Sequence, residues 1–261
     1  MSNIKQDTKL TIGIPTFNGS KYIREALDSM VAQFDEIDRK QLEILISDNA
    51  STDDTQEIIK EYLDKYPEIF SYYKNQENVG FDRNVDLLFK RARGKYVWIF
   101  GDDDIIHENS LKKVLNFLDK DLIFVHLNWS SCSSDLKILE EQTLKINEDT
   151  FCHNISDFIK IVKINPVLVS SNIFNKNCWL EEADIFIETG WIHYAKLLQT
   201  FKRSGDYLAT FESFVKYRGQ TAGYKDDYLI NLKLGLQLFK ILSFYKKDID
   251  LYVLIWLQKD V

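Results

Sequence analysis

The clearest chemical signal in this sequence is a run of three aspartates, Asp102, Asp103 and Asp104. The run stands between two short apolar segments, Val97–Phe100 and Ile105–Ile106. Adjacent carboxylates repel one another and are costly to bury without a partner, so a divalent cation is their natural neutraliser. Oxygen ligands of this kind suit Mg²⁺ or Mn²⁺, which commonly bind one or two carboxylates together with substrate phosphates. The alternative is an acidic loop that caps the next helix, although a cap needs one acid and not three.

Two further polar segments also come directly after apolar runs. The first follows Leu10–Ile14 and the second follows Leu42–Ile46. Ligands of open parallel sheets bind beyond the carboxyl ends of the strands, which makes both segments candidates for binding. An ordinary turn explains the first segment equally well, whereas a helix cap formed by Ser51 explains only the later part of the second. The candidates are Pro15, Thr16, Phe17, Asn18, Asp48 and Asn49.

The elements that must position these residues follow an α/β pattern between Lys9 and Val125. Short apolar β-branched runs alternate with segments of helical periodicity, which is typical of βαβ units and a parallel sheet. Apolar stripes predict helices around residues 23–30, 58–63, 85–92 and 111–118. The expected strands are Leu10–Ile14, Leu42–Ile46, Phe70–Tyr73, Tyr96–Phe100 and Leu122–Val125.

The pattern weakens in the second half of the chain. Here we expect a polar loop at Ser130–Ser134, a hairpin within Leu136–Glu148, a helix at Ile155–Val162 and a strand at Thr210–Tyr217. Helical periodicity returns from Tyr228 to the end, with lysines among the apolar residues. A helix packed on the domain is favoured there over one that lies on a membrane surface.

Composition narrows the classes of function. The chain has 261 residues, of which 45% are hydrophobic and 13% aromatic, enough for a sizeable core. Its net charge of -7 argues against a nucleic-acid partner. The three cysteines, Cys132, Cys152 and Cys178, are widely spaced, which predicts reduced thiols in a cytoplasmic protein. The longest apolar run, Leu251–Trp256, is far below the roughly 18 residues of a membrane span, so we expect a soluble or peripheral protein.

In their order and spacing, the motifs resemble those of family-2 glycosyltransferases of GT-A fold. The resemblance covers about the first half of the chain, and the combination of motifs is more specific than any one of them. It implies an α/β protein with a Rossmann-like, mostly parallel sheet flanked by helices and a C-terminal acceptor-binding and helical region. The matching segments are Pro15–Asn18 for P-x-[YF]-N, Asp48–Asp53 for D-[DN]-x-S-x-D, Asn78–Asn84 for N-x-G-x-x-x-x-N, Arg91–Tyr96 for A-x-G-x-Y, and the three aspartates for D-x-D.

The resemblance implies a metal-dependent, inverting transferase that uses Mn²⁺ or Mg²⁺. The enzyme would move a sugar from a nucleotide diphosphate donor to a hydroxyl of a glycan or lipid-linked acceptor in surface polysaccharide assembly. Counting from Gly94 puts Gly101 and Asp103 at the two acidic positions of D-x-D, whereas a literal match selects Asp102 and Asp104; Asp103 is the expected principal metal ligand. The expected donor-site residues are Pro15, Thr16, Phe17, Asn18, Asp48, Asn49, Arg83, Asp102 and Arg218.

The chain departs from the family where the catalytic base is expected. The family uses an acid from an E-D pair that opens a helix in the second half, but Thr189 and Gly190 stand at those positions. The nearest candidates for the base are Glu188 and His193. Gln220 stands where many relatives carry a histidine, so a third protein ligand for the metal is not expected. The sequence around residues 190–194 and 217–221 looks most like the bacterial, abequosyltransferase-like subgroup.

We expect residues 1–127 to bind nucleotide sugar and metal, and residues 128–224 to form the acceptor-binding half of the same domain. Residues 225–261 would form a helical segment able to contact the inner face of the cell membrane. Two other hypotheses remain open. The three aspartates are also compatible with a Mg²⁺-dependent nucleotidyltransferase or phosphohydrolase, and the missing acid pair is compatible with a degenerate module that only binds sugar or a partner enzyme.

Overall fold

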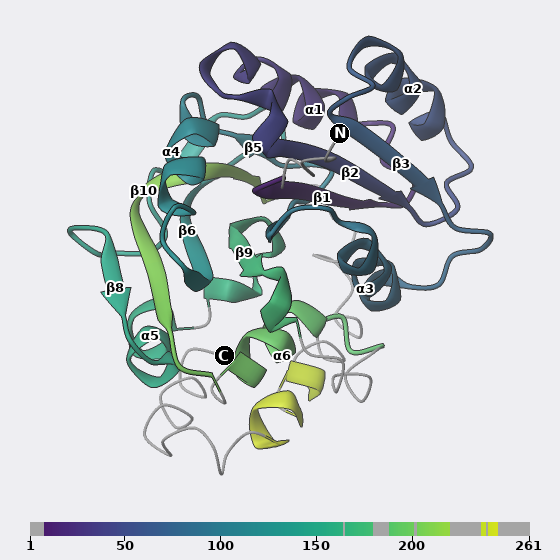
Figure 1. Cartoon of the computed structure of the whole chain (residues 1–261). Coiled ribbons are helices and arrows are strands. Elements are labelled where there is room, and N and C mark those ends of the chain that lie inside the picture. The colour runs from purple at the N-terminus through teal and green to yellow at the C-terminus, as the bar shows by residue number, and fades with distance from the viewer. Residues whose placement is uncertain are drawn as a thin grey trace, which may run out of the picture.

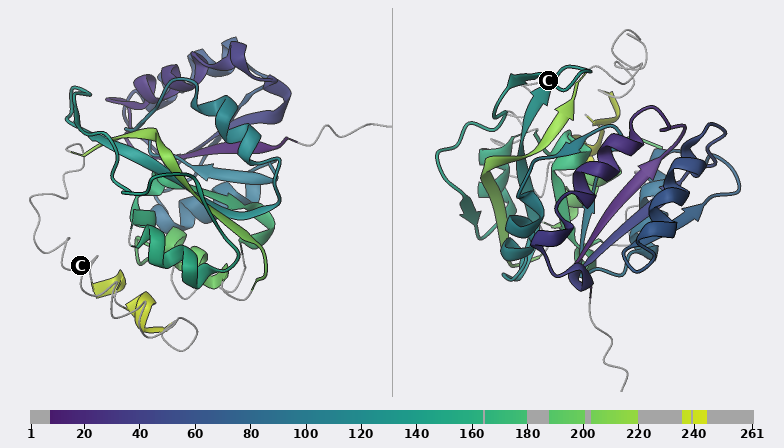
Figure 2. Two further views of the ribbon diagram at one scale, coloured as in Figure 1. Left: turned by 90° about the vertical axis from the view of Figure 1, so that its left-hand side faces the viewer. Right: turned by 90° about the horizontal axis from the view of Figure 1, so that it is seen from above.

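The computed structural model describes residues 8–163, 165–179, 188–200, 203–219, 236–238 and 240–244. These residues form one twisted ten-stranded sheet with helices on both of its faces (Figures 1 and 2). The predicted α/β fold class is therefore confirmed.

Four parallel strands form one side of the sheet in the order β3-β2-β1-β4. All four strands were predicted from their apolar runs. Side chains alternate between the two faces of the sheet, so Trp98 packs in one core and its neighbours Val97 and Ile99 pack in the other. The bounds of these strands are β1 (Leu10–Thr16), β2 (Leu42–Asp48), β3 (Phe70–Lys74) and β4 (Tyr96–Ile99).

The other strands continue the sheet beyond β4. β9 (Asn172–Asn175) pairs antiparallel with β4 and with β6 (Leu122–Cys132), while β10 (Asp206–Arg218) runs parallel to β6. The short β5 (Ile105–Ile106) lies antiparallel to the last part of β10. β7 (Ile138–Glu140) and β8 (Thr150–Cys152) add to β6 and β10 as antiparallel edge pieces.

The predicted polar loop at Ser130–Ser134 is wrong, because β6 continues through Cys132. Ser130 in this strand is buried instead of exposed: it is 0% exposed, and its hydroxyl lies 2.8 Å from Nε2 of His107. The hairpin expected within Leu136–Glu148 is also wrong, since β7 pairs with β6.

Helices cover the two faces of the sheet in two groups, each with its own core. α1 (Ile23–Val31), α2 (Thr55–Lys65) and α4 (Ser110–Phe117) pack on one face. α3 (Phe81–Arg91), α5 (Ile155–Val162) and α6 (Ile192–Gln199) pack on the other face. Short 3₁₀ turns lie at Phe34–Glu36, Arg39–Gln41, Asn165–Val167, Val169–Ser171 and Lys176–Cys178.

A glycine allows α3 to approach the sheet closely. A Cβ atom at Gly13 would lie 2.3 Å from Cδ2 of Leu88, well inside van der Waals contact. Because α3 follows a parallel strand, its N-terminus lies at the edge where the parallel strands end. The close packing therefore helps to hold the start of α3, including Arg83, at that edge.

The boundary predicted between residues 127 and 128 falls inside β6, so the parts before and after it share one sheet. In the C-terminal part, residues 236–238 and 240–244 are helical, and Leu238, Ile241 and Leu242 join the core beside α5 and α6. Gln220 lies outside the described residues, and so does the rest of the predicted C-terminal helix. No helix in the described ranges is long and apolar enough to cross a membrane.

Candidate active site

The predicted donor-site residues on β1, β2 and β4 meet at one edge of the sheet. Thr16 lies in register with Asp48, and the amide of Asn49 donates to the carbonyl of Thr16 over 2.8 Å. On the other side of β1, the amide of Phe100 donates to the carbonyl of Gly13 over 2.9 Å. Three chain segments far apart in sequence therefore end side by side, as predicted for the carboxyl ends of parallel strands.

The loops after β1 and β2 are tied to each other. Asn18 has a left-handed backbone (φ 55°), its amide donates to Oγ of Ser51, and its side-chain oxygen accepts from the amide of Thr52. Ser51 therefore joins the two loops and does not cap α2; the carboxylate of Asp53 accepts the amide of Thr55 at the start of that helix. The ring of Phe17 between these contacts remains 48% exposed.

Asp48 and Asn49 point into the protein. Asp48 is 0% exposed, and its carboxylate accepts the amide of Ser51 over 2.8 Å and the hydroxyl of Tyr72 over 2.6 Å. Asn49 is 4% exposed, and its side-chain oxygen accepts the amide of Val79 over 2.9 Å. These contacts organise the loops around the site; the direct contact with base or ribose that the sequence predicts remains a prediction.

The three aspartates point in different directions. Asp102 accepts a hydrogen bond from the hydroxyl of Thr16, which ties the aspartate loop to the end of β1. Asp104 is 2% exposed, and its carboxylate accepts from the hydroxyl of Ser170 and from the amide of Arg218. In the described part of the chain, no group of three or more His, Cys, Asp or Glu side chains is arranged to hold a metal ion.

Burial raises the pKa of Asp102 to about 7 against the hydrogen bond from Thr16, and the charge of Asp103 adds to the rise. Burial and the charge of Asp103 likewise raise the pKa of Asp104 to about 7. A carboxyl group with a raised pKa lies where negative charge is unfavourable, and a cation beside it would reverse the shift. The electrostatics of this loop therefore fit a bound cation.

The geometry narrows the possible metal ligands. Both oxygens of Asp104 are hydrogen-bonded inside the protein, so Asp102 and Asp103 fit a cation better than Asp104 does, and the assignment of the three aspartates as ligands remains a prediction. This pair fits the usual coordination of Mg²⁺ or Mn²⁺ by one or two carboxylates and substrate phosphates. A Cβ atom at Gly101 would lie 3.0 Å from Oδ1 of Asp103 and 3.2 Å from Oδ2 of Asp104, so the fold leaves little room for an acidic residue there.

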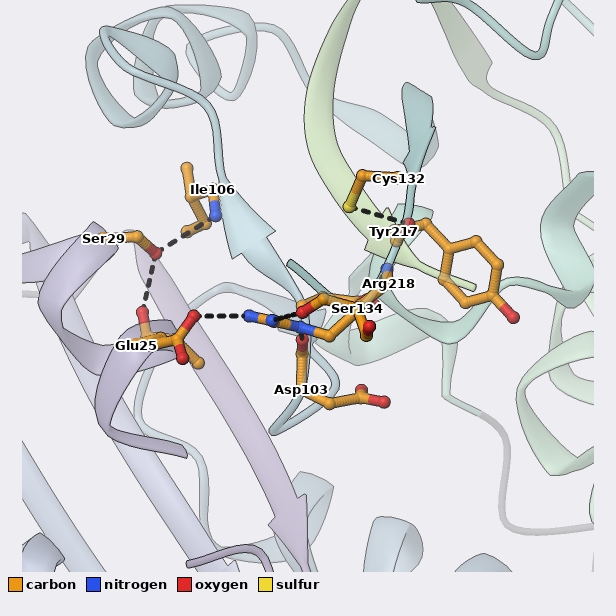
Figure 3. Close-up of polar contacts among 10 residues, drawn as sticks. Glu25, Ser29, Asp103, Ile106, Cys132, Ser134, Tyr217 and Arg218 are labelled. Atoms are coloured by element: carbon orange, nitrogen blue, oxygen red, sulfur yellow. Dashed lines mark hydrogen bonds and ion pairs between the residues drawn. The ribbon is translucent and has the colours of Figure 1, made fainter. Parts of the chain in front are cut away.

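Arg218, predicted to bind the donor, is enclosed at the end of β10 (Figure 3). Its side chain is only 2% exposed in the described structure. The guanidinium donates to the carbonyls of Asp103 and Ser134 and to the carboxylate of Glu25. These contacts tie Arg218 to the aspartate loop, and the donor-binding role that the sequence predicts for it remains a prediction.

Arg83 and Glu188 lie together beside a cavity of about 240 Å³. Nη2 of Arg83 is 3.7 Å from Oε1 of Glu188, and both side chains are more than half exposed. The cavity lies where the N-termini of α3 and α6 meet, and Gly80 and Gly190 contribute to its wall. The predicted pyrophosphate ligand and the predicted base thus lie side by side, on elements that are distant in sequence.

Asp82 is a residue at this cavity that the sequence analysis did not single out. It is 2% exposed, and its carboxylate accepts the amides of Thr189 and Gly190 over 2.8 Å and of Ile192 over 3.2 Å. Burial raises its pKa, although these hydrogen bonds lower it. A side chain on α3 therefore caps α6, and only its place inside the Asn78–Asn84 motif could have drawn attention to it.

His193, the second candidate for the base, is buried on α6. It is 1% exposed, and its Nε2 lies 3.0 Å from the carbonyl oxygen of Val167. Burial lowers its pKa to about 4. This environment favours the alternative that His193 packs in the core, because a general base must reach the acceptor hydroxyl.

The parallel strands, the helices on both faces and the acidic loop after β4 together define a GT-A glycosyltransferase fold. The structure of S. aureus TarS 1–349 in complex with UDP-GlcNAc aligns with a TM-score of 0.72 at 17% identity, covering 91% of this chain and 66% of that one. Mannosyltransferase PcManGT from Pyrobaculum calidifontis, in complex with GDP-Man and Mn²⁺, aligns with a TM-score of 0.63 at 16% identity, covering 92% and 64%. At these identities the likeness establishes the fold.

The sequence profile described as Glycosyl transferase family 2 matches residues 11–168, so the chain belongs to that family. The abequosyltransferase RfbV of Salmonella typhimurium is 29% identical over 262 residues, which cover 91% of this chain and 76% of that protein. The uncharacterized protein Rv1520 of Mycobacterium tuberculosis is 34% identical over 134 residues, covering 51% of this chain and 36% of that protein. The resemblance inferred from the motifs is confirmed, and the chain spans only part of each of these relatives.

Proposed function

We propose that this protein is a metal-dependent, inverting glycosyltransferase. It transfers a sugar from a nucleotide diphosphate donor to a hydroxyl of a glycan or lipid-linked acceptor in surface polysaccharide assembly. The observation that carries the proposal is the contact between Thr16 and Asp102, because it joins the end of β1 to the acidic loop after β4. Family membership and the nucleotide sugars named for the two aligned structures support the same assignment.

The cation site of the proposal consists of Asp102 and Asp103. A divalent cation held there would neutralise the charge that builds up on the departing nucleoside diphosphate. The loop of Thr16–Asn18 and the ends of β2 would surround the base and ribose, and Arg83 would approach the pyrophosphate. The nearby N-terminus of α3 adds partial positive charge, which also favours an anionic donor.

Glu188 is the proposed general base. Its exposed side chain lies on the cavity opposite Arg83, where it can meet an acceptor from solvent. Arg83 keeps a positive charge close to this carboxylate and can orient it. The acceptor oxygen would then attack the anomeric carbon from the face opposite the nucleotide, which inverts the configuration.

The test is a panel of nucleotide sugars incubated with the protein in Mn²⁺, in Mg²⁺ and in EDTA. Release of a nucleoside diphosphate that depends on the cation supports the proposal. Release of pyrophosphate or phosphate indicates a nucleotidyltransferase or phosphohydrolase, and binding of sugar without any release indicates a non-catalytic module. A product with retained anomeric configuration would contradict the single-displacement mechanism.

A membrane-associated acceptor is part of the proposal. The two exposed apolar side chains on the described C-terminal helical residues are Leu236 (61%) and Phe244 (58%), which is compatible with contact at a membrane surface. Sedimentation with anionic liposomes tests this contact. Binding that weakens as salt is raised supports it, and no binding leaves this segment as a helix packed on the domain.

A further inference from the structure

Arg218 ties together three segments of the chain that meet behind the aspartate loop (Figure 3). Its Nε donates to the carbonyl of Asp103 over 2.9 Å, and Nη1 donates to the carbonyl of Ser134 over 2.5 Å. Nη2 forms an ion pair of 2.7 Å with Glu25 on α1. The guanidinium therefore joins the acidic loop, the segment after β6 and the first helix.

The main chain of Arg218 contacts the same loop. Its amide donates to Oδ1 of Asp104 over 2.9 Å. Asp104 is held in turn by the hydroxyl of Ser170, which also accepts the amide of Gly101. Both the backbone and the side chain of Arg218 thus hold consecutive residues of the loop.

The charge of Arg218 is stabilised although it is buried. The carboxylate of Glu25 neutralises it, and the ring of Tyr22 lies 4.7 Å from the guanidinium carbon. A buried arginine without such partners would be costly. Glu25 lies in α1 and Tyr22 lies directly before it, so the helix that follows the β1 loop helps to hold the aspartate loop.

We infer that Arg218 is a positioning residue, which fixes the backbone at Asp103 so that this carboxylate can meet a divalent cation. In Figure 3 the Asp103 carboxylate is directed away from the guanidinium, which holds the main-chain oxygen. This inference rests on the proposed function, because it assumes that the acidic loop binds a cation. It replaces the direct contact with the donor that the sequence predicts for Arg218.

The fixed geometry of the guanidinium is essential to this role. Its planar group directs separate donors at three acceptors simultaneously, whereas a lysine ammonium is a compact charge on a flexible stem. Arg218→Lys therefore keeps the positive charge near Glu25 but loses the rigid link between Asp103 and Ser134. We expect the folded variant to bind Mn²⁺ about 10- to 100-fold more weakly, the usual effect of removing a group that orients a metal ligand.

The experiment titrates the full chain with Mn²⁺ alone and follows free Mn²⁺ by electron paramagnetic resonance. Thermal unfolding of each variant is measured in parallel, so that loss of structure is recognised. Arg24→Met is the matched control, because Arg24 lies on α1 and forms an ion pair with Glu61 at the surface. Its Mn²⁺ affinity should equal that of the unaltered chain.

If Arg218→Lys does not fold, Glu25→Gln decides the question. This change removes the charge that holds Nη2 and leaves the acceptors at Asp103 and Ser134 in place. We expect Mn²⁺ affinity to fall by about two- to five-fold, in line with the free energy of a partly exposed ion pair. An unchanged affinity in Glu25→Gln would overturn the inference.

The inference and the proposed function fail in different ways. If the unaltered chain binds Mn²⁺, Asp103→Ala abolishes binding, and folded Arg218→Lys binds as tightly as the unaltered chain, the inference alone is wrong. If Arg218→Lys binds the donor more weakly but binds Mn²⁺ with unchanged affinity, the result would instead support direct contact between Arg218 and the donor. If the unaltered chain does not bind Mn²⁺, the proposed cation dependence fails and the inference fails with it.

Discussion

At the scale of single residues, the three aspartates of the loop differ in the contacts that hold them. Asp104 is buried under Ser170 and the amide of Arg218, so it anchors the loop. Asp102 accepts from Thr16, and the charge of Asp103 helps to raise the pKa of both neighbours. The charge of Asp103 thus disfavours ionisation of both neighbouring carboxyl groups, and in the proposed function the oxygens of Asp103 bind the cation.

Asp103→Ala should lower turnover by at least about 10²-fold, because the proposed leaving-group stabilisation is lost. The free energy of unfolding should stay within about 1 kcal/mol of that of the unaltered chain, since the change relieves repulsion on Asp102 and Asp104. Activity against Mn²⁺ concentration and urea unfolding measure the two effects. Asp64→Ala, at an exposed site on α2, is the control and should change neither. Unchanged turnover in Asp103→Ala would refute the metal assignment.

Glu188→Gln should lower kcat by roughly 10²- to 10⁴-fold, the usual contribution of a general base, while donor binding is retained. His193→Ala should instead lower the free energy of unfolding, because this ring is buried and contacts Val167. Steady-state kinetics and urea unfolding of both variants distinguish the roles. If Glu188→Gln keeps near-normal kcat and a folded His193→Ala loses it, the base is His193.

At the scale of elements, the carboxylate of Asp82 links two helices that are distant in sequence, α3 and α6. α3 provides both Arg83 and Asp82, and α6 follows Glu188. Asp82 satisfies the amides at the start of α6, which would otherwise lack partners, and its charge suits the positive end of that helix. The position of the proposed base relative to the donor side therefore depends on this cap.

Asp82→Asn should destabilise the protein by about 1–3 kcal/mol, because an amide offers only one oxygen to the three backbone N–H groups and directs an NH₂ group at the rest. We also expect kcat to fall, since Glu188 precedes the residues that Asp82 holds. Urea unfolding and kinetics measure the effects, with Asp64→Asn as a surface control. Normal stability in Asp82→Asn would show that the cap contributes little.

At the scale of the whole molecule, three histidines of the described residues lie in environments that keep them uncharged: His126 on β6, His193 on α6 and the partly buried His107 directly after β5. Burial lowers the pKa of His107 and of His193 to about 4 and that of His126 to about 3. The unfolded chain would bind protons at these sites near pH 6.5, so protonation below that pH favours unfolding. Their stabilising contribution is fully present above about pH 6.5 and declines as the pH falls toward 4.

His126→Leu isolates one of these contributions, because His126 is 0% exposed on β6 and burial is the main cause of its lowered pKa. Between pH 7 and pH 5 the unaltered chain should lose about 2 kcal/mol more free energy of unfolding than the variant, given a pKa of about 3 in the fold. Urea unfolding at the two pH values measures this difference. Equal pH dependence of the two proteins would contradict a depressed His126 pKa.

The sequence by itself determined the parallel half of the fold and the edge at which the chemistry lies. Apolar runs of strand length, helical stripes between them and polar residues directly after the runs are local signals, and they located β1 to β4 with their ends. The same signals failed on β6, since Ser130 is polar but buried against His107. A buried polar side chain depends on a partner that the local pattern does not reveal.

The tertiary structure alone decided which of the chemically suitable side chains are available. The three aspartates are equivalent in sequence, yet packing by Ser170 and β10 withdraws Asp104 from the surface. Arg218 likewise carried the charge expected of a donor ligand, but contacts with α1 and the acidic loop enclose it. The direction, burial and hydrogen-bond partners of a side chain depend on its neighbours as well as on its own type. Those neighbours come from segments far apart in the sequence, so they are set only when the chain folds.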